Sequence, residues 1–201
     1  MLNKVIRRKQ PKGNFAFIDS QNLNLGVQRI GWKMSWRKLL EYLQAEHGVT
    51  KAFLFIGYMQ ENEDLYKQMH EIGYHVILKP TLDMFEEVAK KEDKDIKGNC
   101  DADLVLEAMK QWPNYQKAII ISGDGDFYGL IEHLAEKNKL LNVMVPNWQY
   151  SSLLKDFEKY IVRVDKLQNR LQHYDKRKPK TKFRHTQKKQ RPNNSQNRNK
   201  N

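Results

Sequence analysis

The sequence has a single cysteine, Cys100, and no long run of apolar residues. One cysteine excludes an intramolecular disulfide and a zinc site built on several thiolates, and none of the six histidines lies at metal-ligand spacing from another. No stretch is apolar over the length that a bilayer requires, and the first residues, MLNKVIRRKQ, lack the apolar segment of a secretory signal. We therefore expect a cytoplasmic protein that makes no membrane contact.

Several common functional motifs are also missing. The sequence contains no glycine-rich loop of the kinds that hold phosphate groups. A phosphatase with an aspartyl nucleophile would carry a second aspartate two residues after Asp19, but Gln21 stands there. A calcium loop of the EF-hand type would continue with oxygen ligands after Asp126, but the segment YGLIEHL has helical spacing. These three kinds of site are therefore excluded.

Acidic residues are scarce at both ends of the chain. Residues 1–12 have five Lys or Arg and no acid, and residues 170–201 have twelve Lys or Arg and one acid. The whole chain carries a formal charge of +12, yet residues 13–169, with nineteen basic and twenty-three acidic side chains, carry −4. Basic ends on an acidic body predict that the ends contact a polyanion.

We therefore divide the chain into a basic N-terminal arm (1–12), one folded domain (13–169) and a basic tail (170–201). With 201 residues, the chain is long enough for one domain with a sizeable core. The tail has almost no aliphatic residues, so it cannot bury enough apolar surface to offset the entropy lost on ordering. We expect the tail to be disordered.

Within the domain, expected strands and helices alternate. Short apolar runs predict strands at 14–20, 51–58, 75–80, 117–122 and 140–146. Helical spacing predicts a closing helix from about residue 151 and helices at 35–48, 62–74, 100–112 and 126–138. The apolar face of the helix at 100–112 is expected to comprise Leu104, Val105, Ala108 and Met109. Residues 81–99 predict a long loop or a weak helix, and we expect the four tryptophans in the core or at its rim.

This alternation predicts an α/β protein with a mainly parallel, doubly wound sheet and helices on both faces. In such sheets, ligands bind at the carboxyl ends of the strands where the strand order reverses. Asp19 ends the first expected strand, and Asp124 and Asp126 follow the fourth. Asp101 stands at the start of a helix. If the central strands are neighbours, these four carboxylates converge at one edge of the sheet.

Carboxylates gathered in this way repel one another. Two of them about 5 Å apart repel by roughly 3 kcal/mol at an effective dielectric constant near 20. The cost is tolerable if some groups hold protons or if a divalent cation lies among them. Ligation by oxygen alone suits Mg²⁺ or Mn²⁺, and water on such a cation can attack a phosphodiester. Taken singly, each aspartate could equally be a turn or helix-cap residue.

Three segments in order, FIDSQNL, KGNCDADLVLEAM and IIISGDGDFYGLIEHL, closely resemble the NYN-domain family of the PIN-like nuclease superfamily, in its LabA-type branch. The resemblance covers most of residues 13–146. It implies a PIN-like, Rossmann-like fold with a five-stranded parallel sheet and a metal-dependent ribonuclease site. The acidic positions of the family match four residues here: Asp19, Asp101, Asp124 and Asp126. Asp103 lies where relatives often carry a further acid.

We therefore expect hydrolysis of RNA phosphodiester bonds with Mg²⁺ or Mn²⁺ as the cofactor. The four aspartates would hold one or two ions, directly or through water. Asn22 or Ser122 would position the attacking water or a phosphate oxygen. Salt-sensitive contacts with RNA are expected from basic residues, one before the second acidic motif and the rest in the tail: Lys97, Lys176, Arg177, Lys178, Lys180, Lys182, Arg184, Lys188, Lys189 and Arg191.

Two other functions stay open. The same fold could serve as a non-catalytic RNA-binding or regulatory protein. It could also be a nuclease that acts on DNA, because no residue that reads a 2′-hydroxyl can be named. The tail could also be a solubilising appendage, and a homo-oligomer is compatible with the sequence.

Overall fold

The computed structural model describes residues 12–57, 60–79 and 100–174. The predicted N-terminal arm up to residue 11, the expected loop or weak helix at 81–99 and the tail from residue 175 lie outside the described residues. Within the described ranges, no helix combines the length and the apolar character that crossing a membrane requires.

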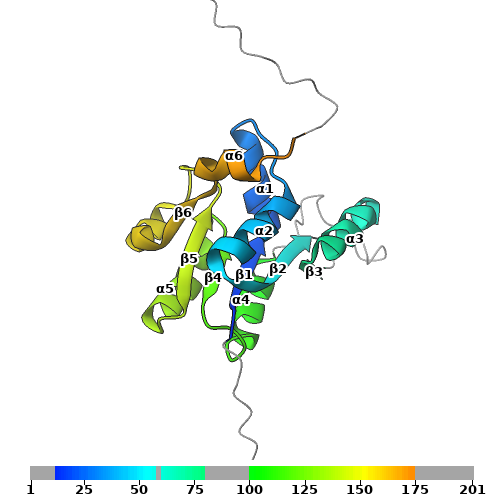
Figure 1. Cartoon of the computed structure of the whole chain (residues 1–201). Helices are drawn as coiled ribbons and strands as arrows, with labels where there is room; N and C mark the ends of the chain where they lie inside the picture. The colour runs from blue at the N-terminus through cyan, green and yellow to red at the C-terminus, as the bar shows by residue number, and fades with distance from the viewer. Residues whose placement is uncertain (1–11, 58–59, 80–99, 175–201) are drawn as a thin grey trace, which may run out of the picture.

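One sheet forms the centre of the molecule, and helices flank it (Figure 1). Its strands are β1 (Asn14–Asp19), β2 (Val49–Gly57), β3 (His75–Lys79), β4 (Ala118–Ile121), β5 (Leu140–Val145) and β6 (Ile161–Arg163). The α-helices are α1 (Ser20–Arg29), α2 (Trp36–His47), α3 (Glu63–Ile72), α4 (Asp101–Lys110), α5 (Tyr128–Glu136) and α6 (Gln168–Leu171). The 3₁₀ helices are η1 (Gln60–Asn62), η4 (Gly125–Phe127), η5 (Ser152–Tyr160) and η6 (Val164–Leu167).

The strands are all parallel, in the order β3-β2-β1-β4-β5-β6, which can be followed across Figure 1. The chain moves from β1 out to β3 in one direction and from β4 out to β6 in the other. The order therefore reverses between β1 and β4, which pair directly, with Ile18 opposite Ile121 at the carboxyl end. Open α/β sheets bind ligands at such a reversal, just outside the carboxyl ends of the strands.

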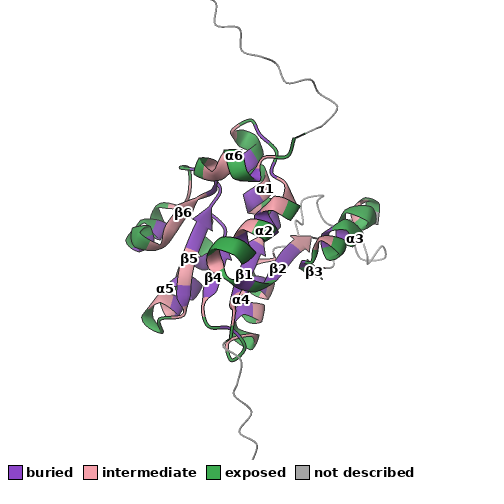
Figure 2. Cartoon of the chain, viewed as in Figure 1, coloured by how far each residue is buried: buried purple, intermediate pink, exposed green. Residues whose placement is uncertain are grey.

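Alternate residues of each strand point to opposite faces of the sheet. Ala16 and Ile18 pack with side chains of α1, α2 and α3 in one core, and Phe15 and Phe17 pack with those of α4 and α5 in a second core. The strands are buried and the outer surfaces of the helices are exposed (Figure 2). Because right-handed crossovers change face when the chain changes direction across the sheet, these two cores confirm the predicted doubly wound arrangement.

The sheet has six strands, not the five that we expected. The helix expected from about residue 151 is present as the 3₁₀ helix η5, but it does not close the domain, because the strand β6 follows it. The β-branched side chains of Ile161 and Val162 favour extended backbone. They pair with Val143 and Met144 of β5, which would otherwise be an edge strand with unpaired backbone groups.

The helix α1 was not expected at all. Its sequence, SQNLNLGVQR, includes two asparagines and a glycine, which are poor helix formers. The helix forms because Asp19 caps its first turn and because Leu23 and Val27, four residues apart, are both buried in the first core. One prediction for α4 also fails, since Met109 is 39% exposed and does not belong to the buried face.

Packed structure continues past residue 169, where we placed the end of the domain. Leu171, in α6, is fully buried in the first core. Gln172 forms an isolated antiparallel bridge with Met34, and its carbonyl accepts a hydrogen bond from Lys38 Nζ at 2.8 Å. The first few residues that we assigned to the tail are therefore part of the folded domain.

Candidate active site at the carboxyl edge of the sheet

Asp19 is the last residue of β1 and the N-cap of α1. Its Oδ1 accepts the backbone N–H of Asn22 at 3.0 Å, and its Oδ2 accepts the hydroxyl of Ser122 at 3.1 Å. The capping role that any strand-end aspartate can play is therefore present here. Serine, threonine or asparagine would cap as well, so capping does not explain why the residue carries a charge.

Ser122 connects the ends of β1 and β4. Its side chain is buried, and while its hydroxyl donates to Asp19, its Oγ accepts the backbone N–H of Asp124 at 3.2 Å. A second bridge runs beside the first, because Asn22 Oδ1 accepts the backbone N–H of Gly123 at 2.9 Å. These two bridges bring together four of the residues that the sequence singled out, Asp19, Asn22, Ser122 and Asp124. We call these four residues the switch-point cluster, because they lie where the strand order of the sheet reverses.

The pKa of Asp19 shows that acidic side chains are crowded in this cluster. Burial raises the pKa of Asp19 above its usual range, and the hydrogen bonds from the Asn22 backbone and the Ser122 hydroxyl oppose this rise. The negative charge of Asp124 raises the same pKa further. Asp19 and Asp124 are therefore close enough to repel each other, as expected for carboxylates at neighbouring strand ends.

Asp126 joins the cluster through its backbone rather than through its carboxylate. Asp124 caps η4, and its Oδ1 accepts the backbone N–H of Asp126 at 3.1 Å. The side chain of Asp126 is exposed, whereas Asp124 is half-buried. The two acids of the GDGD segment thus occupy different environments, and Asp124 is the one that faces the end of β1.

Asp101 approaches the same edge from α4, which it begins. The pKa of the thiol of the preceding residue, Cys100, is affected by the charged side chains around it. Burial raises the pKa of the Cys100 thiol to about 11, and among nearby charges Lys79 lowers that pKa whereas Asp103, Asp19 and Asp101 raise it. Asp101 and Asp19 therefore act on one thiol from two different elements. Burial therefore favours the protonated form of this thiol.

Asp103 is paired with a cation. Its Oδ2 lies 3.4 Å from Nζ of Lys79, the last residue of β3, and both side chains are partly exposed. A surface pair of this kind contributes about 0–1 kcal/mol. Sequence reasoning overlooked Lys79, although a lysine at the carboxyl end of a strand is a signal that could have placed it near the site.

The donor chemistry of the site fits a hard divalent cation. The anions near the strand ends are carboxylates, and Mg²⁺ is usually held by one or two carboxylates while it keeps several waters. Among the described residues, no group of three or more His, Cys, Asp or Glu side chains is arranged to hold a metal. The four-aspartate metal group that we expected is therefore not assembled among the described residues. Asp19 and Asp124 are the two carboxylates that lie close together there.

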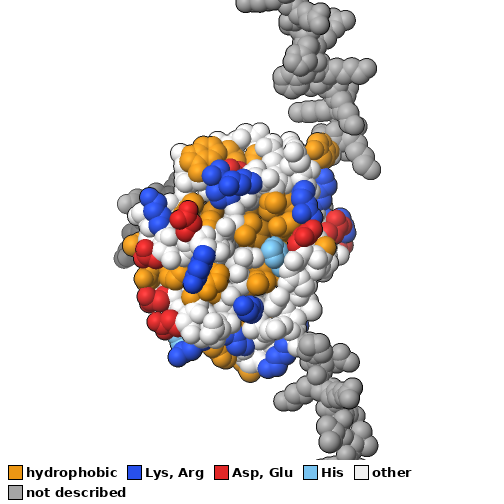
Figure 3. Space-filling view, turned by 60° about the vertical axis from the view of Figure 1, so that its left-hand side comes forward, with side chains coloured by type: hydrophobic (Ala, Val, Ile, Leu, Met, Phe, Trp, Pro, Cys, Tyr) orange, Lys and Arg blue, Asp and Glu red, His pale blue; other side chains and the backbone are white. Residues whose placement is uncertain are grey.

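The predicted RNA contacts cannot be placed in the same way. Lys97 and the basic tail residues from Lys176 to Arg191 lie outside the described residues. On the face shown in Figure 3, Lys and Arg side chains are interspersed with hydrophobic ones, and acidic side chains lie toward both the left and the right edge. That face is mixed in charge, in keeping with the small net charge of residues 13–169.

A parallel, doubly wound sheet with linked acidic and polar side chains at its strand reversal defines a Rossmann-like α/β protein, a class that binds ligands at the carboxyl edge of the sheet. Residues 15–165 match the family model of the NYN domain. The chain belongs to the NYN domain family, which is related to the PIN-like nucleases.

Two individual proteins are similar to this chain, one in sequence and one in fold. The chain is 26% identical over 139 residues to the low amplitude and bright protein LabA of Synechococcus elongatus, a match that covers 67% of this chain and 74% of LabA. The crystal structure of a protein of unknown function from Vibrio parahaemolyticus superposes with a TM-score of 0.64 at 21% identity. That match covers 83% of this chain and 99% of the other, and it supports the α/β fold.

Proposed function

We propose that this protein is a metal-dependent ribonuclease that hydrolyses RNA phosphodiester bonds at the switch-point cluster. One observation carries the proposal: Asp19 and Asp124 lie at the reversal of the sheet, joined through Ser122, in a chain of the NYN family. A buried carboxylate with a raised pKa beside a second carboxylate is a repulsive arrangement that a divalent cation would relieve.

Each member of the cluster has a distinct task in this proposal. Asp19 and Asp124 would hold Mg²⁺ or Mn²⁺, and Asp101 and Asp126 would act on it through water. When bound, such a cation supplies a polarised phosphate and a water of lowered pKa. Ser122 fixes the orientation of the Asp19 carboxylate through its hydrogen bond to Oδ2.

Asn22 has a different role from the acids. Its side-chain oxygen is held by the backbone of Gly123, so its amide group is fixed in orientation. The same residue lines a groove beside the cluster. From that position the amide can donate a hydrogen bond to a phosphate oxygen of the substrate.

The test is cleavage of a labelled single-stranded RNA by the purified full chain in Mn²⁺ or Mg²⁺. Asp19→Asn and Asp124→Asn should each lower the rate at least about 100-fold, because the metal contributes several kcal/mol to the transition state. Asp64→Asn, at an exposed position in the first turn of α3, is the matched control and should cut like wild type. Equal cleavage by wild type and Asp124→Asn would identify the activity as a contaminant.

The basic tail is proposed to attract the RNA. Residues 170–201 carry a surplus of eleven positive charges, whereas residues 13–169 carry a charge of −4. Each Lys or Arg that contacts a phosphate releases counterions, so RNA binding should weaken steeply as the salt concentration rises. Removing residues 175–201 should lower both the affinity and its salt dependence.

A second candidate function is a non-catalytic RNA-binding or regulatory protein of the same fold. The observation that favours it is that no group of three potential metal-binding side chains assembles among the described residues. RNA binding that is unchanged in EDTA, together with no cleavage in Mn²⁺ or Mg²⁺, would select this alternative. Cleavage of single-stranded DNA at the same rate as RNA would select a nuclease that does not read the sugar.

A further inference from the structure

A polar groove lies directly beside the switch-point cluster. It is formed by α1, by the turn after β4 and by the segment after β5, and it is lined by Asn22, Leu25, Gly26, Arg29, Gly123, Pro146, Asn147 and Gln149. Its volume is about 120 Å³, against the roughly 10–15 Å³ that one water needs. Because Asn22 belongs to both and the lining residue Gly123 lies between Ser122 and Asp124, a molecule in this groove would lie next to the acids.

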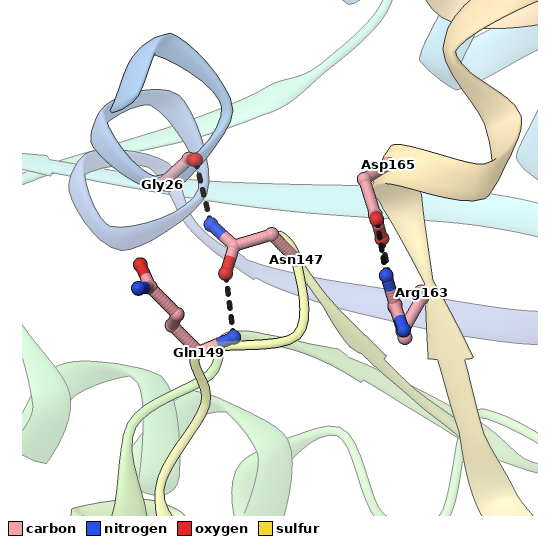
Figure 4. A network of polar contacts seen from close by, with 5 residues as sticks. All are labelled: Gly26, Asn147, Gln149, Arg163 and Asp165. Carbon is pink, nitrogen blue, oxygen red and sulfur yellow. Dashed lines mark hydrogen bonds and ion pairs between the residues drawn. The ribbon is translucent and has the colours of Figure 1, made fainter. Parts of the chain in front are cut away.

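The walls of the groove are fixed in position by buried polar contacts. The side chain of Asn147 is buried, donates through Nδ2 to the carbonyl of Gly26 at 2.8 Å and accepts the backbone N–H of Gln149 through Oδ1 at 2.7 Å (Figure 4). This residue thus fastens the segment after β5 to α1. The side chain of Gln149 reaches toward α1 beside it (Figure 4). A groove held in this way is preorganised for a ligand.

The charge of the groove is opposite to that of the cluster. Its lining residues include one cation, Arg29, and no acid. The amides of Asn22 and Gln149 add neutral hydrogen-bonding groups. A phosphodiester chain that is repelled by the four aspartates when no metal is present would meet a favourable environment here. Arg29, at the last turn of α1, is the residue that would pair with a phosphate.

Trp148 stands out beside this groove, between the lining residues Asn147 and Gln149 in the sequence. Its side chain is 55% exposed, contrary to the expectation that all four tryptophans pack in the core or at its rim. The indole is nevertheless held in place, because the Arg163 guanidinium lies 5.7 Å from its ring centroid. Arg163 is in turn held by Asp165, to which it donates two hydrogen bonds (Figure 4).

An exposed tryptophan supported by a fixed arginine is a suitable platform for a nucleobase. Stacking on an aromatic ring is available to any base that is not already stacked in a duplex. Two further apolar side chains are exposed near the same edge, Leu25 in the groove and Leu153 beside Gly125 of the acidic turn. Apolar surface of this kind close to a charged site suits the faces of bases flanking a phosphate.

We propose that the groove and Trp148 form a binding subsite for single-stranded RNA next to the scissile phosphate. Arg29 binds a phosphate, Asn22 and Gln149 donate to the sugar–phosphate chain or to base edges, and Trp148 stacks on a flanking base. The subsite rests on the proposed function for the position of the cut, but its binding of RNA does not depend on catalysis.

The test uses the full chain in EDTA, so that no cleavage occurs, titrated with an oligouridylate of about ten nucleotides, within the usual size of single-strand sites. The readouts are tryptophan fluorescence and the anisotropy of a label on the RNA. Binding should quench the fluorescence, and Trp148→Phe should remove this quenching. The basic tail contributes no fluorescence of its own, because the sequence has no tryptophan after Trp148. Trp112→Phe, at a site by the opposite edge of the sheet, should leave the quenching in place.

Measurements of RNA affinity test the stacking role of Trp148 and the phosphate-binding role of Arg29 separately. Trp148→Ala should weaken binding about 5- to 150-fold, the range for one stacked base, while Trp148→Phe should recover part of the loss. Arg29→Gln should weaken binding and reduce the salt slope by about one unit. Lys137→Gln removes an equal charge at the C-cap of α5, just before β5 begins at the amino edge, and should change neither quantity.

The outcomes separate this inference from the proposed ribonuclease activity. Quenching by a duplex of the same length equal to that by the single strand, or wild-type affinity in Trp148→Ala, would overturn the subsite. If the wild-type chain cleaves RNA in Mn²⁺ while no quenching occurs, the subsite is wrong and the ribonuclease proposal stands. If quenching is seen and lost in Trp148→Phe without any cleavage by wild type, the subsite stands and the ribonuclease proposal is wrong.

Discussion

Ser122 and Asp19 lie 103 positions apart in the chain, and the hydroxyl of Ser122 donates to Oδ2 of Asp19 at 3.1 Å. The same hydroxyl oxygen accepts the backbone N–H of Asp124, so a single buried side chain links the carboxylate of Asp19 to the backbone of Asp124. This relationship exists because β1 and β4 are neighbours at the reversal of the sheet. It makes the acidic site sensitive to small changes in polar groups that never touch a substrate.

Neutralising Asp19 should stabilise the metal-free protein. Asp19→Asn keeps an oxygen for the cap of α1 and removes a buried charge that faces Asp124, so the free energy of unfolding in EDTA should rise. Asp19→Ala also loses the cap, which costs about 1 kcal/mol relative to the asparagine variant. Urea denaturation of the three proteins measures both effects. An asparagine variant less stable than wild type would contradict the repulsion between the two carboxylates.

The stability of the metal-free protein should depend on pH through the same residue. The pKa of Asp19 is raised in the folded state, first by burial, so the folded protein holds this proton more tightly than the unfolded chain does. The resulting stabilisation is fully present below the unfolded pKa of about 3.9 and is lost as pH rises through the folded value.

The measurement is the difference in free energy of unfolding between wild type and Asp19→Asn, followed from about pH 4 to about pH 8. Wild type should lose stability relative to the variant across the lower part of this range, and saturating Mn²⁺ should restore it at the upper end. A difference that is flat with pH in EDTA would show that Asp19 has the same pKa in both states.

The contact between α1 and the segment after β5 should tolerate no added methyl group. A Cβ on Gly26 would lie 2.5 Å from Cβ of Pro146, so Gly26→Ala should lower the free energy of unfolding by about 1–3 kcal/mol. Gly129, in α5, has open space at the same position, and Gly129→Ala should instead raise stability by about 0.5–1 kcal/mol. Thermal melts of the pair compare them directly, and equal melting temperatures would argue against the close packing of α1 on Pro146.

The end of the folded domain should lie beyond residue 169. A chain that ends at Tyr174 keeps Leu171 in the core, whereas one that ends at Asn169 loses it. Leu171→Ala in the full chain should cost about 2–5 kcal/mol, as for other buried leucines. The chain ending at Tyr174 should melt like the full chain, and the shorter one should melt at a clearly lower temperature. Equal melting temperatures for the two truncated chains would place the boundary where the sequence suggested.

Sequence reasoning succeeded where the pattern is local and strong. The strands β2 and β4 are continuous apolar runs, and α2 is an amphipathic stretch that begins after Ser35 and ends at Gly48 in the left-handed conformation. It failed where neighbours decide the outcome. The helix α1 depends on the cap from Asp19, and β6 depends on an edge strand to pair with, so the residues of each segment alone indicate its structure only weakly.

The sequence by itself determined that strands and helices alternate and that aspartates follow two of the apolar strands, because side-chain periodicity and chain order are written in it directly. Only the tertiary structure decided that β1 and β4 lie side by side, that Ser122 and Asn22 bridge their ends, and that Trp148 is left exposed next to a polar groove. The reason is that contacts between residues a hundred positions apart depend on the order of the strands, and several orders bury the same apolar residues equally well.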